Sequence, residues 1–490
     1  MVKVVKMKKF LCVLLAVILC CCAFVGCKTN EEPDDTGVNW GDIPGGEDST
    51  DDEEEYTGPK TTLTVLTNRV DLVNTTLVEY KNRFEDEFPQ YNIVWQAFND
   101  YDKTVSTRLP SGDYGDVCLI PATVSKKTLP TYFTVLSNNL EQMQGLYRYA
   151  DIKAYNGNVY GLPTYGNANG ILYNKKVFRE AGVTELPSTY DEFYAAMGKI
   201  KNHYANDSSF LAPYYTNFKD SWALEQWSGA ITGVAGDPDY YYSVLPSDRT
   251  AFTEGPVYKV HELLYELVRR GYTEAAPAST DWERSKVEFC RGNIGTMLMG
   301  SWAVSQIVGI AQDLVEGNAH KDDGSWVESV PGDEHIDPAD IGYMPFPYTH
   351  EDGKIYSAHS PDYFWAVNRN TTNEKKTGGF IFIKWMIEKS GYYVLCGGIP
   401  PKLEMEFPDL IKGFEDLGVV LLPENAATGD LAGKLELVES RSGVVLWSSD
   451  WKNAIVEEAF KIRQGESGFS YAEIMANVNE DWLYGIDAVM

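Results

Sequence analysis

The order of apolar runs and polar breaks predicts strands and helices that alternate along the first part of the chain. Short runs rich in β-branched residues predict strands at residues 62–67, 92–98 and 116–121. Between the first two strands, apolar residues recur at helical spacing from Leu72 to Phe88, and Pro89 ends the predicted helix. This order predicts an α/β fold with mostly parallel sheets flanked by helices.

The stretch at residues 159–200 carries the strongest local signals. VYGLP and GILY predict two strands, and the run TYGNANG between them predicts a polar and aromatic loop. Open α/β sheets hold ligands at the ends of their strands. The loop that contains Tyr165, Asn167 and Asn169 is therefore a candidate ligand-binding segment.

Helix starts and amphipathic runs mark the rest of the chain. Asn174 predicts the start of one helix, and Thr189 with Glu192 forms a capping box at the start of the next. Further helices are expected at residues 256–270 and 377–389. Two helices are expected at the end of the chain, and Ser470 and Glu473 form a capping box for the last one.

The N-terminal residues predict export. Four lysines precede the apolar run at residues 10–24, the pattern of a secretory signal peptide that is too short for a good membrane-spanning helix. Residues 24–27, Phe-Val-Gly-Cys, resemble a bacterial lipobox, which implies removal of residues 1–26 and lipidation of Cys27. The protein would then be held by lipid at the extracellular face of the cell membrane. The alternative is an ordinary signal peptide in which Cys27 is incidental.

Charge and cysteine content narrow the choice of partners. The segment from Lys28 to about Gly58 has twelve acidic residues and one basic residue, so residues 27–58 are expected to form a disordered acidic tether; a functional acidic arm is the alternative. The net charge of −29 disfavours nucleic acid and anionic membrane surfaces as partners. Three further cysteines lie in apolar surroundings and are expected to be buried thiols: Cys118, Cys290 and Cys396.

Motifs for catalysis are missing from the mature sequence. His261 and Glu262 give half of a zinc-protease motif, but Tyr265 stands where the second histidine is required. The sequence has no G-x-S-x-G, Walker A or G-x-G-x-x-G motif, and its six histidines have no ligand spacing. No cofactor or metal is predicted. The sequence does not exclude the paired carboxylates of a glycosidase, because the distance between two carboxylates in space is not visible in a sequence.

Three groups of residues resemble the extracellular solute-binding proteins of sugar ABC transporters, the maltose-binding-like group. The first follows the order G-x-x-Y-G-x-P, Y-N-K, F-x-x-A-G and P-x-T-aromatic-x-E-F, at Gly157, Tyr160, Gly161, Pro163, Tyr173, Asn174, Lys175, Phe178, Ala181, Gly182, Pro187, Thr189, Tyr190, Glu192 and Phe193. The second is a Gly-Ser-Trp segment, at Gly292, Met297, Gly300, Ser301 and Trp302. The third is GGIPP at residues 397–401.

The resemblance implies a two-lobed, type II periplasmic-binding-protein-like fold with a ligand cleft between the lobes. Lobe one would comprise residues 60–163 plus 363–405, and lobe two residues 164–362 plus 406–490. The implied function is capture of a carbohydrate, an oligosaccharide above all, by hinge closure and delivery to an ABC permease, by a monomer that is not an enzyme. The alternatives are the same fold with a non-sugar ligand, such as a cation caged by aromatic residues, and a secreted glycan-cleaving enzyme.

The resemblance also implies where the ligand binds, since sugars require aromatic plates and a rim of polar groups. Trp302 is expected to be the main aromatic ring that stacks on the sugar, and the alternative is that it is a core residue. The other ligand-binding candidates are Tyr165, Asn167, Tyr214, Trp451 with Trp447 as its substitute, Asn68, Arg69, Asp362 and Tyr363. Tyr214 and Trp451 are equally compatible with the core, Asn68 with a helix cap, and Asp362 and Tyr363 with a hinge. Tyr173 and Asn174 are expected to be structural, and residues 240–242 to form a packing loop.

Overall fold

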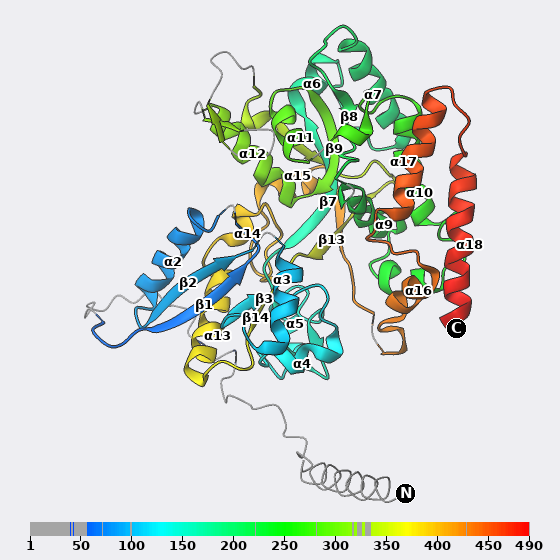
Figure 1. The fold of residues 1–490 in the computed structure, drawn as a ribbon. Coiled ribbons are helices and arrows are strands. Elements are labelled where there is room, and N and C mark those ends of the chain that lie inside the picture. Colours follow the sequence, from blue (N-terminus) through cyan, green and yellow to red (C-terminus); the bar gives the residue numbers. More distant parts are fainter. Residues whose placement is uncertain are drawn as a thin grey trace, which may run out of the picture.

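The computed structural model describes Trp40, Ile43 and residues 56–490, apart from residues 71, 99, 221, 281, 316–317, 321–325, 329–334, 428 and 490. The predicted signal peptide, the lipidation site Cys27 and most of the acidic segment lie outside the described residues. The described chain forms two lobes, each built around its own β-sheet (Figure 1). No helix among the described residues is long and apolar enough to cross a membrane.

Lobe one is built on a five-stranded sheet in the order β2-β1-β3-β14-β6. Its strands are β1 (Thr61–Thr67), β2 (Tyr91–Ala97), β3 (Val117–Leu119), β6 (Leu162–Pro163) and β14 (Phe364–Val367). A short hairpin pairs β4 (Ala154–Tyr155) with β5 (Asn158–Val159). The helices of this lobe are α2 (Thr76–Glu87), α3 (Tyr101–Arg108), α4 (Leu129–Tyr132), α5 (Leu140–Gln144), α13 (Asn373–Glu388) and α14 (Tyr392–Leu395).

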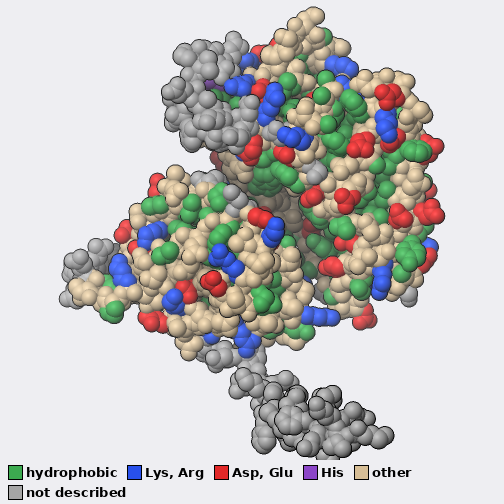
Figure 2. Space-filling view, in the orientation of Figure 1, with side chains coloured by type: hydrophobic (Ala, Val, Ile, Leu, Met, Phe, Trp, Pro, Cys, Tyr) green, Lys and Arg blue, Asp and Glu red, His purple; other side chains and the backbone are tan. Residues whose placement is uncertain are grey.

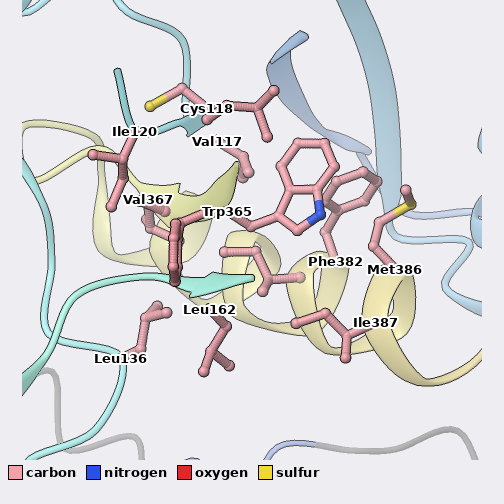
Figure 3. Close-up of a cluster of buried hydrophobic side chains, with 14 of the residues drawn as sticks. Val117, Cys118, Ile120, Leu136, Leu162, Trp365, Val367, Phe382, Met386 and Ile387 are labelled. Carbon is pink, nitrogen blue, oxygen red and sulfur yellow. The ribbon is translucent and has the colours of Figure 1, made fainter. Parts of the chain in front are cut away.

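The core of lobe one joins parts of the chain that are more than 200 residues apart. Trp365 on β14 is 1% exposed and packs edge-on against Phe382 of α13, with ring centroids 6.1 Å apart. Residues of β3 and β6 surround the same indole (Figure 3). Because β14 and α13 supply part of this core, the lobe is complete only after the chain has returned from lobe two.

Lobe two has a second sheet in the order β15-β13-β7-β9-β8, and β12 also pairs with β7. Its strands are β7 (Gly166–Asn174), β8 (Ala212–Tyr214), β9 (Ile294–Gly300), β12 (Ile341–Met344), β13 (Ile355–Pro361) and β15 (Val419–Pro423). The longer helices around it are α7 (Tyr190–His203), α10 (Pro256–Arg269), α11 (Trp282–Cys290), α12 (Trp302–Val315), α17 (Asp450–Arg463) and α18 (Tyr471–Val489). Shorter helices are α6 (Lys175–Glu180), α8 (Trp222–Glu225), α9 (Ile231–Ala235), α15 (Asp409–Asp416) and α16 (Lys434–Ser442). A separate hairpin pairs β10 (Asn318–His320) with β11 (Trp326–Glu328).

The sheets are mixed rather than mostly parallel, which differs from the sequence prediction. In lobe one, β1 is parallel to β2 and β3, but β14 is antiparallel to β3 and β6. In lobe two, β7 is antiparallel to β9, β12 and β13. The reason is the path of the chain: strands that leave one lobe or return to it enter the sheet from the opposite end.

The predicted loop at TYGNANG is wrong, because most of this run belongs to strand β7. Asn167 pairs with Ser360 of β13 and Asn169 pairs with Gly300 of β9, so both asparagines lie in the middle of a sheet. A Cβ on Gly170 would lie 2.6 Å from the carbonyl oxygen of Met344. Glycine is needed at that position for close approach of a neighbouring strand and not for a turn.

The predicted helix starts agree with the structure, except that one capping side chain, Glu192, has a different hydrogen-bond partner. The Asn174 side chain accepts a hydrogen bond from the Val177 amide, 3.2 Å away. At the start of α7, Thr189 accepts from the Glu192 amide, but the Glu192 carboxylate accepts from the amide and hydroxyl of Ser188 instead of from Thr189. The capping box of Ser470 and Glu473 forms in both directions, as predicted.

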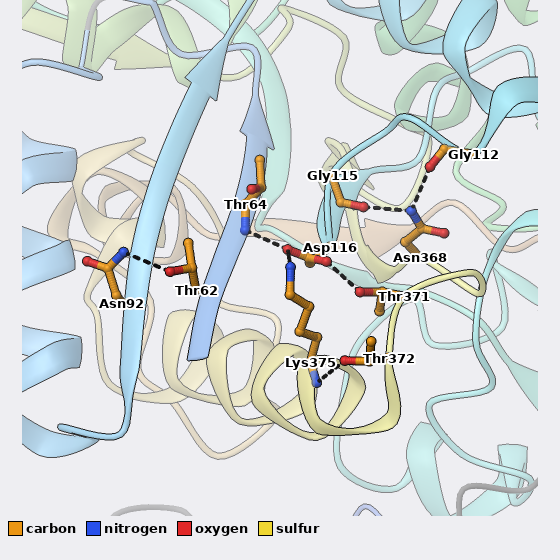
Figure 4. A network of polar contacts seen from close by, with 10 residues as sticks. All are labelled: Thr62, Thr64, Asn92, Gly112, Gly115, Asp116, Asn368, Thr371, Thr372 and Lys375. Carbon is orange, nitrogen blue, oxygen red and sulfur yellow. Dashed lines mark hydrogen bonds and ion pairs between the residues drawn. The ribbon is translucent and has the colours of Figure 1, made fainter. Parts of the chain in front are cut away.

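Asp116, at the start of β3, ties together three segments of lobe one (Figure 4). One carboxylate oxygen accepts from the Thr64 amide of β1 at 2.8 Å and from the ammonium of Lys375 on α13 at 2.9 Å. The other accepts from the Thr371 hydroxyl at 2.5 Å. Asn368 closes the same network by donating to the carbonyl oxygens of Gly112 and Gly115. This network stabilises the return of the chain to lobe one.

Two residues of the predicted disordered tether are buried in lobe one. Trp40 is 2% exposed and Ile43 is 3% exposed, and both belong to the lobe-one core. The structure therefore differs from the predicted unpacked tether at these two positions. The cause is physical: a tryptophan and an isoleucine are hydrophobic enough to bind an apolar surface even within a polar segment.

Candidate functional site

A cleft of about 490 Å³ lies between the two lobes. Figure 2 shows the hollow, where hydrophobic side chains are visible between the lobes. Lobe one supplies Ile120, Ala122, Ile152, Lys153, Tyr363 and Phe364. The lining continues, across the crossing and into lobe two, with Asn167, Ala168, Asn169, Gln226, Gly229, Tyr242, Gly300, Trp302, Ala358, Ser360, Pro361, Asp362, Glu424 and Trp447. The volume falls within the range of about 300–1,000 Å³ that is typical of small-molecule sites.

Trp302 lines the cleft as the first residue of α12. Its indole packs against two further tryptophans, Trp282 at 5.5 Å and Trp222 at 5.9 Å between ring centroids. A Cβ on Gly300 would lie 2.7 Å from the Trp302 ring, so the indole takes the space that this glycine leaves open. The Trp302 indole is thus held by two neighbouring tryptophans before any ligand arrives.

Besides Phe364, three more aromatic residues line the cleft with Trp302. Trp447 lines it and is 40% exposed, which leaves its ring available for contact. Tyr363 lines it, and its hydroxyl donates to the carboxylate of Asp102. Tyr242, in the helical turn Tyr240–Val244, also lines the cleft. The prediction of a mere packing loop at residues 240–242 therefore missed one cleft residue, although Tyr240 and Tyr241 are buried in lobe two.

Two asparagines of β7 reach the cleft from its lobe-two side. Asn169 donates to the carbonyl oxygen of Gln226 at 3.1 Å. The carbonyl oxygens of both side chains, Asn167 and Asn169, are buried and have no hydrogen-bond partner among the described residues. A buried acceptor without a donor costs about 1–3 kcal/mol. The two asparagines line the same cleft as Trp302, and amide groups suit a ligand that carries hydroxyl groups.

Two carboxyl groups and one lysine ammonium line the cleft. Burial raises the pKa of Asp362 above its ordinary value, against the opposing effect of a hydrogen bond from the Tyr165 hydroxyl. Burial raises the pKa of Glu424 to about 7, although the Thr232 hydroxyl donates to it at 2.7 Å. Burial, with a smaller contribution from Lys126, lowers the pKa of Lys153 to about 8. Because burial disfavours their charged forms, these groups are suited to hydrogen bonding with a neutral polar ligand.

Of the residues expected at the site, the structure brings Trp302, Asn167, Asp362, Tyr363 and Trp447 together at the cleft. Tyr165 lies directly behind the lining and is 6% exposed. Its hydroxyl hydrogen bond to Asp362 and its ring contact with Tyr392 give it a supporting position.

Four other candidates lie away from the cleft lining. Tyr214 is 1% exposed and packs on Trp227 in the core of lobe two, which corrects the expectation that it contacts ligand. Trp451 packs against His261 and donates its indole N–H to the Val445 carbonyl, so its substitute Trp447 takes the cleft position. The remaining two are Asn68 and Arg69.

Asn68 and Arg69 follow β1 but lie outside the cleft lining. The guanidinium of Arg69 contacts the thiol of Cys396 at 3.2 Å, and its charge partly offsets the burial that raises the pKa of Asp362. Arg69 therefore influences the cleft electrostatically, through Asp362. Helix α2 begins at Thr76, with Thr75 as its N-cap residue, so Asn68 is not the helix cap that was its alternative.

The cleft also contains residues that no local signal in the sequence indicated. Lys153, Gln226 and Glu424 come from turns and short helices with no recognisable motif. Among the residues that the structure describes, no three histidine, cysteine or acidic side chains form a group that could hold a metal ion. The site is thus an aromatic and polar pocket, assembled from both lobes.

Two α/β lobes that enclose such a pocket define a solute-binding protein. The model of the family "Bacterial extracellular solute-binding protein" matches residues 72–392, and the chain belongs to this family. The match confirms the resemblance that the sequence motifs carry. The two-lobed fold is confirmed as well.

Solved structures of similar proteins extend over nearly the whole chain. A binding protein of an ABC transporter from Bifidobacterium animalis subsp. lactis, solved with mannobiose, is 32% identical over 92% of this chain and 99% of its own, with a TM-score of 0.74. A manno-oligosaccharide-specific solute-binding protein from the same subspecies, solved with mannotriose, is 30% identical with the same coverage and a TM-score of 0.75. The multiple sugar-binding protein of Streptococcus mutans is 29% identical over 176 residues, which is 34% of this chain and 40% of that protein. The chain thus matches less than half the length of this curated relative.

Proposed function

We propose that the protein captures an oligosaccharide in the cleft between its lobes and delivers it to the membrane permease of an ABC importer. The observation that carries the proposal is the fixed indole of Trp302 in a cleft that the amide side chains of Asn167 and Asn169 also line. An indole face stacks on the apolar C–H face of a sugar ring, and amide oxygens accept from sugar hydroxyls.

We further propose a mannose-based oligosaccharide as the ligand. Its support is the similarity to two proteins solved with mannobiose and mannotriose, at 30–32% identity over 92% of this chain. Several aromatic residues spread along the cleft, Trp302, Tyr242, Trp447 and Tyr363, offer more than one stacking position. A ligand of two or more sugar units can use several such positions at once.

Closure of the two lobes is the proposed mechanism. Ligand that binds the lobe-two wall, at Trp302 and Asn167, would also contact Lys153 and Tyr363 when the lobes approach. The proposed boundaries are residues 60–163 plus 363–405 for lobe one and 164–362 plus 406–490 for lobe two. They are supported by the positions of β6 and β14 in one sheet and of β7 and β13 in the other. Capture requires no bond cleavage, and we propose that the protein has no enzymatic activity.

Anchoring by lipid at Cys27 is part of the proposal and rests on the sequence of residues 1–27. It would hold a monomer at the extracellular face of the cell membrane, near the permease. Mass spectrometry of the N-terminal peptide, with Cys27→Ser as the unmodified control, tests it. An unmodified Cys27 in membrane-bound wild-type protein would contradict this part and leave ligand capture untouched.

Thermal unfolding of the chain at residues 28–490 with a panel of sugars tests the function. A ligand that binds only the folded state raises Tm by mass action. We expect mannobiose or mannotriose to raise Tm, and Trp302→Ala to abolish the shift. Tyr484→Ala is the matched control, because Tyr484 is a 68% exposed aromatic residue on α18, outside the cleft lining. A shift with amines or peptides only would replace the carbohydrate ligand, and release of shorter sugars during incubation would show an enzyme instead.

A further inference from the structure

Trp40 is 2% exposed, although it lies in an acidic segment of the sequence. Its indole N–H donates to the hydroxyl of Tyr147 at 3.0 Å, and the two rings pack edge-to-face with centroids 6.0 Å apart. The Tyr147 hydroxyl in turn donates to the carboxylate of Glu388, at the end of α13. The indole is thus held by a buried polar contact as well as by apolar packing, which fixes its orientation.

Ile43 makes the second contact, three residues further on. Its side chain is 3% exposed, and its carbonyl oxygen accepts from the ammonium of Lys384 on α13 at 2.7 Å. The Ile43 amide also donates to the carbonyl oxygen of Trp40 at 3.4 Å, which links the two buried residues. We call Tyr147, Lys384 and Glu388 the seat, and Trp40 with Ile43 the clip.

The seat belongs entirely to lobe one and lies outside the cleft lining. Tyr147 follows α5, and Lys384 and Glu388 are residues of α13. Glu388 also pairs with Lys402 at 3.5 Å. None of the seat or clip residues lines the cleft, so the described contacts leave the ligand site free.

We propose that the clip fastens the acidic N-terminal segment to lobe one, so that lobe one is the lobe held at the membrane and lobe two is the lobe that moves. The membrane part of this inference rests on the proposed lipid anchor at Cys27. The docking of the clip does not.

The length of chain between the anchor and the clip limits how far lobe one can lie from the membrane. Between Cys27 and Trp40 the chain advances 13 residues, 40 minus 27. Even fully extended, they span at most about 45 Å, whereas the 34 residues from Cys27 to the start of β1 at Thr61 could span about 120 Å. The clip therefore shortens the reach of lobe one from the anchor by more than half. It also sets which face of lobe one, that of α13, lies nearest to the point of attachment.

Docking of the clip is favoured because it is intramolecular. The segment between Ile43 and Thr61 holds the clip at high effective concentration near the seat, and the entropy of closing such a loop rises only slowly with its length. A single tryptophan with one isoleucine is therefore sufficient to stay bound, where a free peptide of the same sequence would bind weakly.

Fluorine NMR of the chain at residues 28–490, labelled with 5-fluorotryptophan, tests docking. Phe substitutions of Trp40, Trp365 and Trp447 identify three of the 12 tryptophan signals. We expect a soluble gadolinium chelate to broaden the Trp40 signal as little as that of Trp365, which is 1% exposed, and several-fold less than that of Trp447, which is 40% exposed. A Trp40 signal that broadens as much as that of Trp447 would overturn the clip.

Variants of the seat test the partners without altering the clip. Tyr147→Phe and Lys384→Ala should each move the Trp40 signal towards the exposed position. Tyr56→Ala is the matched control, since Tyr56 is the other described aromatic residue of the segment and is 40% exposed. Ligand-induced Tm shifts should be unchanged in all three variants, which separates failure of the clip from failure of the proposed function.

Energy transfer tests which lobe is held near the membrane. The full-length lipoprotein carries a donor dye on one lobe and is bound to phosphatidylcholine vesicles with an acceptor dye on the lipid headgroup. Donors at Lys127→Cys in lobe one and Glu480→Cys in lobe two use exposed positions, while Cys118, Cys290 and Cys396 are buried. We expect stronger energy transfer from position 127 than from position 480. In Trp40→Ala the difference between the two positions should fall several-fold. Equal transfer from both positions in the wild type would overturn the membrane part of the proposal. Protein that fails to bind vesicles would overturn the lipid anchor instead.

Discussion

Glu424 shows how a single buried carboxyl connects the cleft to stability. Its pKa is raised from an ordinary value of 4.5 to about 7 by burial, and the Thr232 hydroxyl only partly offsets this effect. The folded state therefore binds more protons than the unfolded state between these two values, and stability falls as pH rises through that window. At one pKa unit per 1.36 kcal/mol, the loss is at most about 3 kcal/mol.

Glu424→Gln should remove this loss, because the amide stays neutral at every pH. We expect the unfolding free energy of the variant, relative to wild type, to rise by up to about 3 kcal/mol between pH 4.5 and pH 8. Urea unfolding at both pH values measures it. Glu480→Gln, at an exposed position of α18, is the control and should show no such rise. A difference that stays constant with pH would contradict the raised pKa of Glu424.

Gly300 controls the position of the cleft plate. Its missing side chain leaves the space that the Trp302 indole occupies, since a Cβ would lie 2.7 Å from the ring. Overpacking at a close contact costs about 1–3 kcal/mol, so Gly300→Ala should displace the indole and weaken ligand binding about tenfold or more. Titration calorimetry with the ligand found in the sugar panel measures it.

Gly309 offers the matched control for that substitution. It lies in α12, and a Cβ there would meet no heavy atom within 4 Å outside the residues next to it in the helix. Gly309→Ala should leave affinity unchanged and add about 0.5–1 kcal/mol of stability through helix propensity. Unchanged affinity in a correctly folded Gly300→Ala variant would remove Trp302 from its proposed role.

At the scale of elements, the sequence predicted helix starts better than the central strand. Asn174 and Ser470 cap helices as expected, because a cap depends on residues three positions apart. The segment around Asn167 was predicted as a loop, since its glycines and asparagines are typical of turns. In β7 these glycines serve tertiary contacts: a Cβ on Gly166 would lie 2.3 Å from the Tyr149 hydroxyl. Residues that are distant in the sequence determine why glycine is required at these positions, and a local sequence pattern carries no information about them.

The Asp116 network should matter for the stability of lobe one and not for binding. Hydrogen bonds to a charged group contribute about 1.5–3 kcal/mol, so Asp116→Asn should lower the unfolding free energy by that amount. Asp113→Asn, three residues earlier at an exposed position, should stay within about 0.5 kcal/mol of wild type. Urea unfolding compares the two. An Asp116→Asn variant as stable as wild type would show that the amide replaces the carboxylate at no cost to β1 and α13.

For the molecule as a whole, the motifs predicted the family and fold but only part of the cleft. Trp302 and Asp362 were placed correctly at its lining, whereas Tyr214 belongs to the core of lobe two and Trp451 is partly buried against that core. An aromatic residue near a strand end suits either place, and only the packing of both lobes decides between them. Glu424 had no local signal, because its position in the cleft depends on β15 joining β13.

The contact between Tyr149 and His359 connects the two lobes beside the crossing segments. Tyr149 belongs to the core of lobe one and His359 to β13, and the hydroxyl lies 2.5 Å from the imidazole Nδ1. Burial lowers the pKa of His359 to about 4, with a smaller contribution from Arg148, so the imidazole is neutral at pH 7. The lowered pKa also means that stability falls as pH drops from about 6.5 towards 4, where the unfolded state binds the extra proton.

Tyr149→Phe should distinguish the contribution of this contact to the stability of the protein from its effect on lobe movement. The variant keeps the ring but leaves Nδ1 of His359 without its partner, which should cost about 1–3 kcal/mol in urea unfolding. If the bond also restrains the lobes, small-angle scattering should give a larger radius of gyration for the ligand-free variant than for ligand-free wild type, and equal values with saturating ligand. Tyr173→Phe, on β7 within lobe two, is the control and should change neither quantity. Lower stability with an unchanged radius of gyration would mean that the contact stabilises the packing of the lobes without restraining their closure. The hinge would then depend on the crossing segments alone.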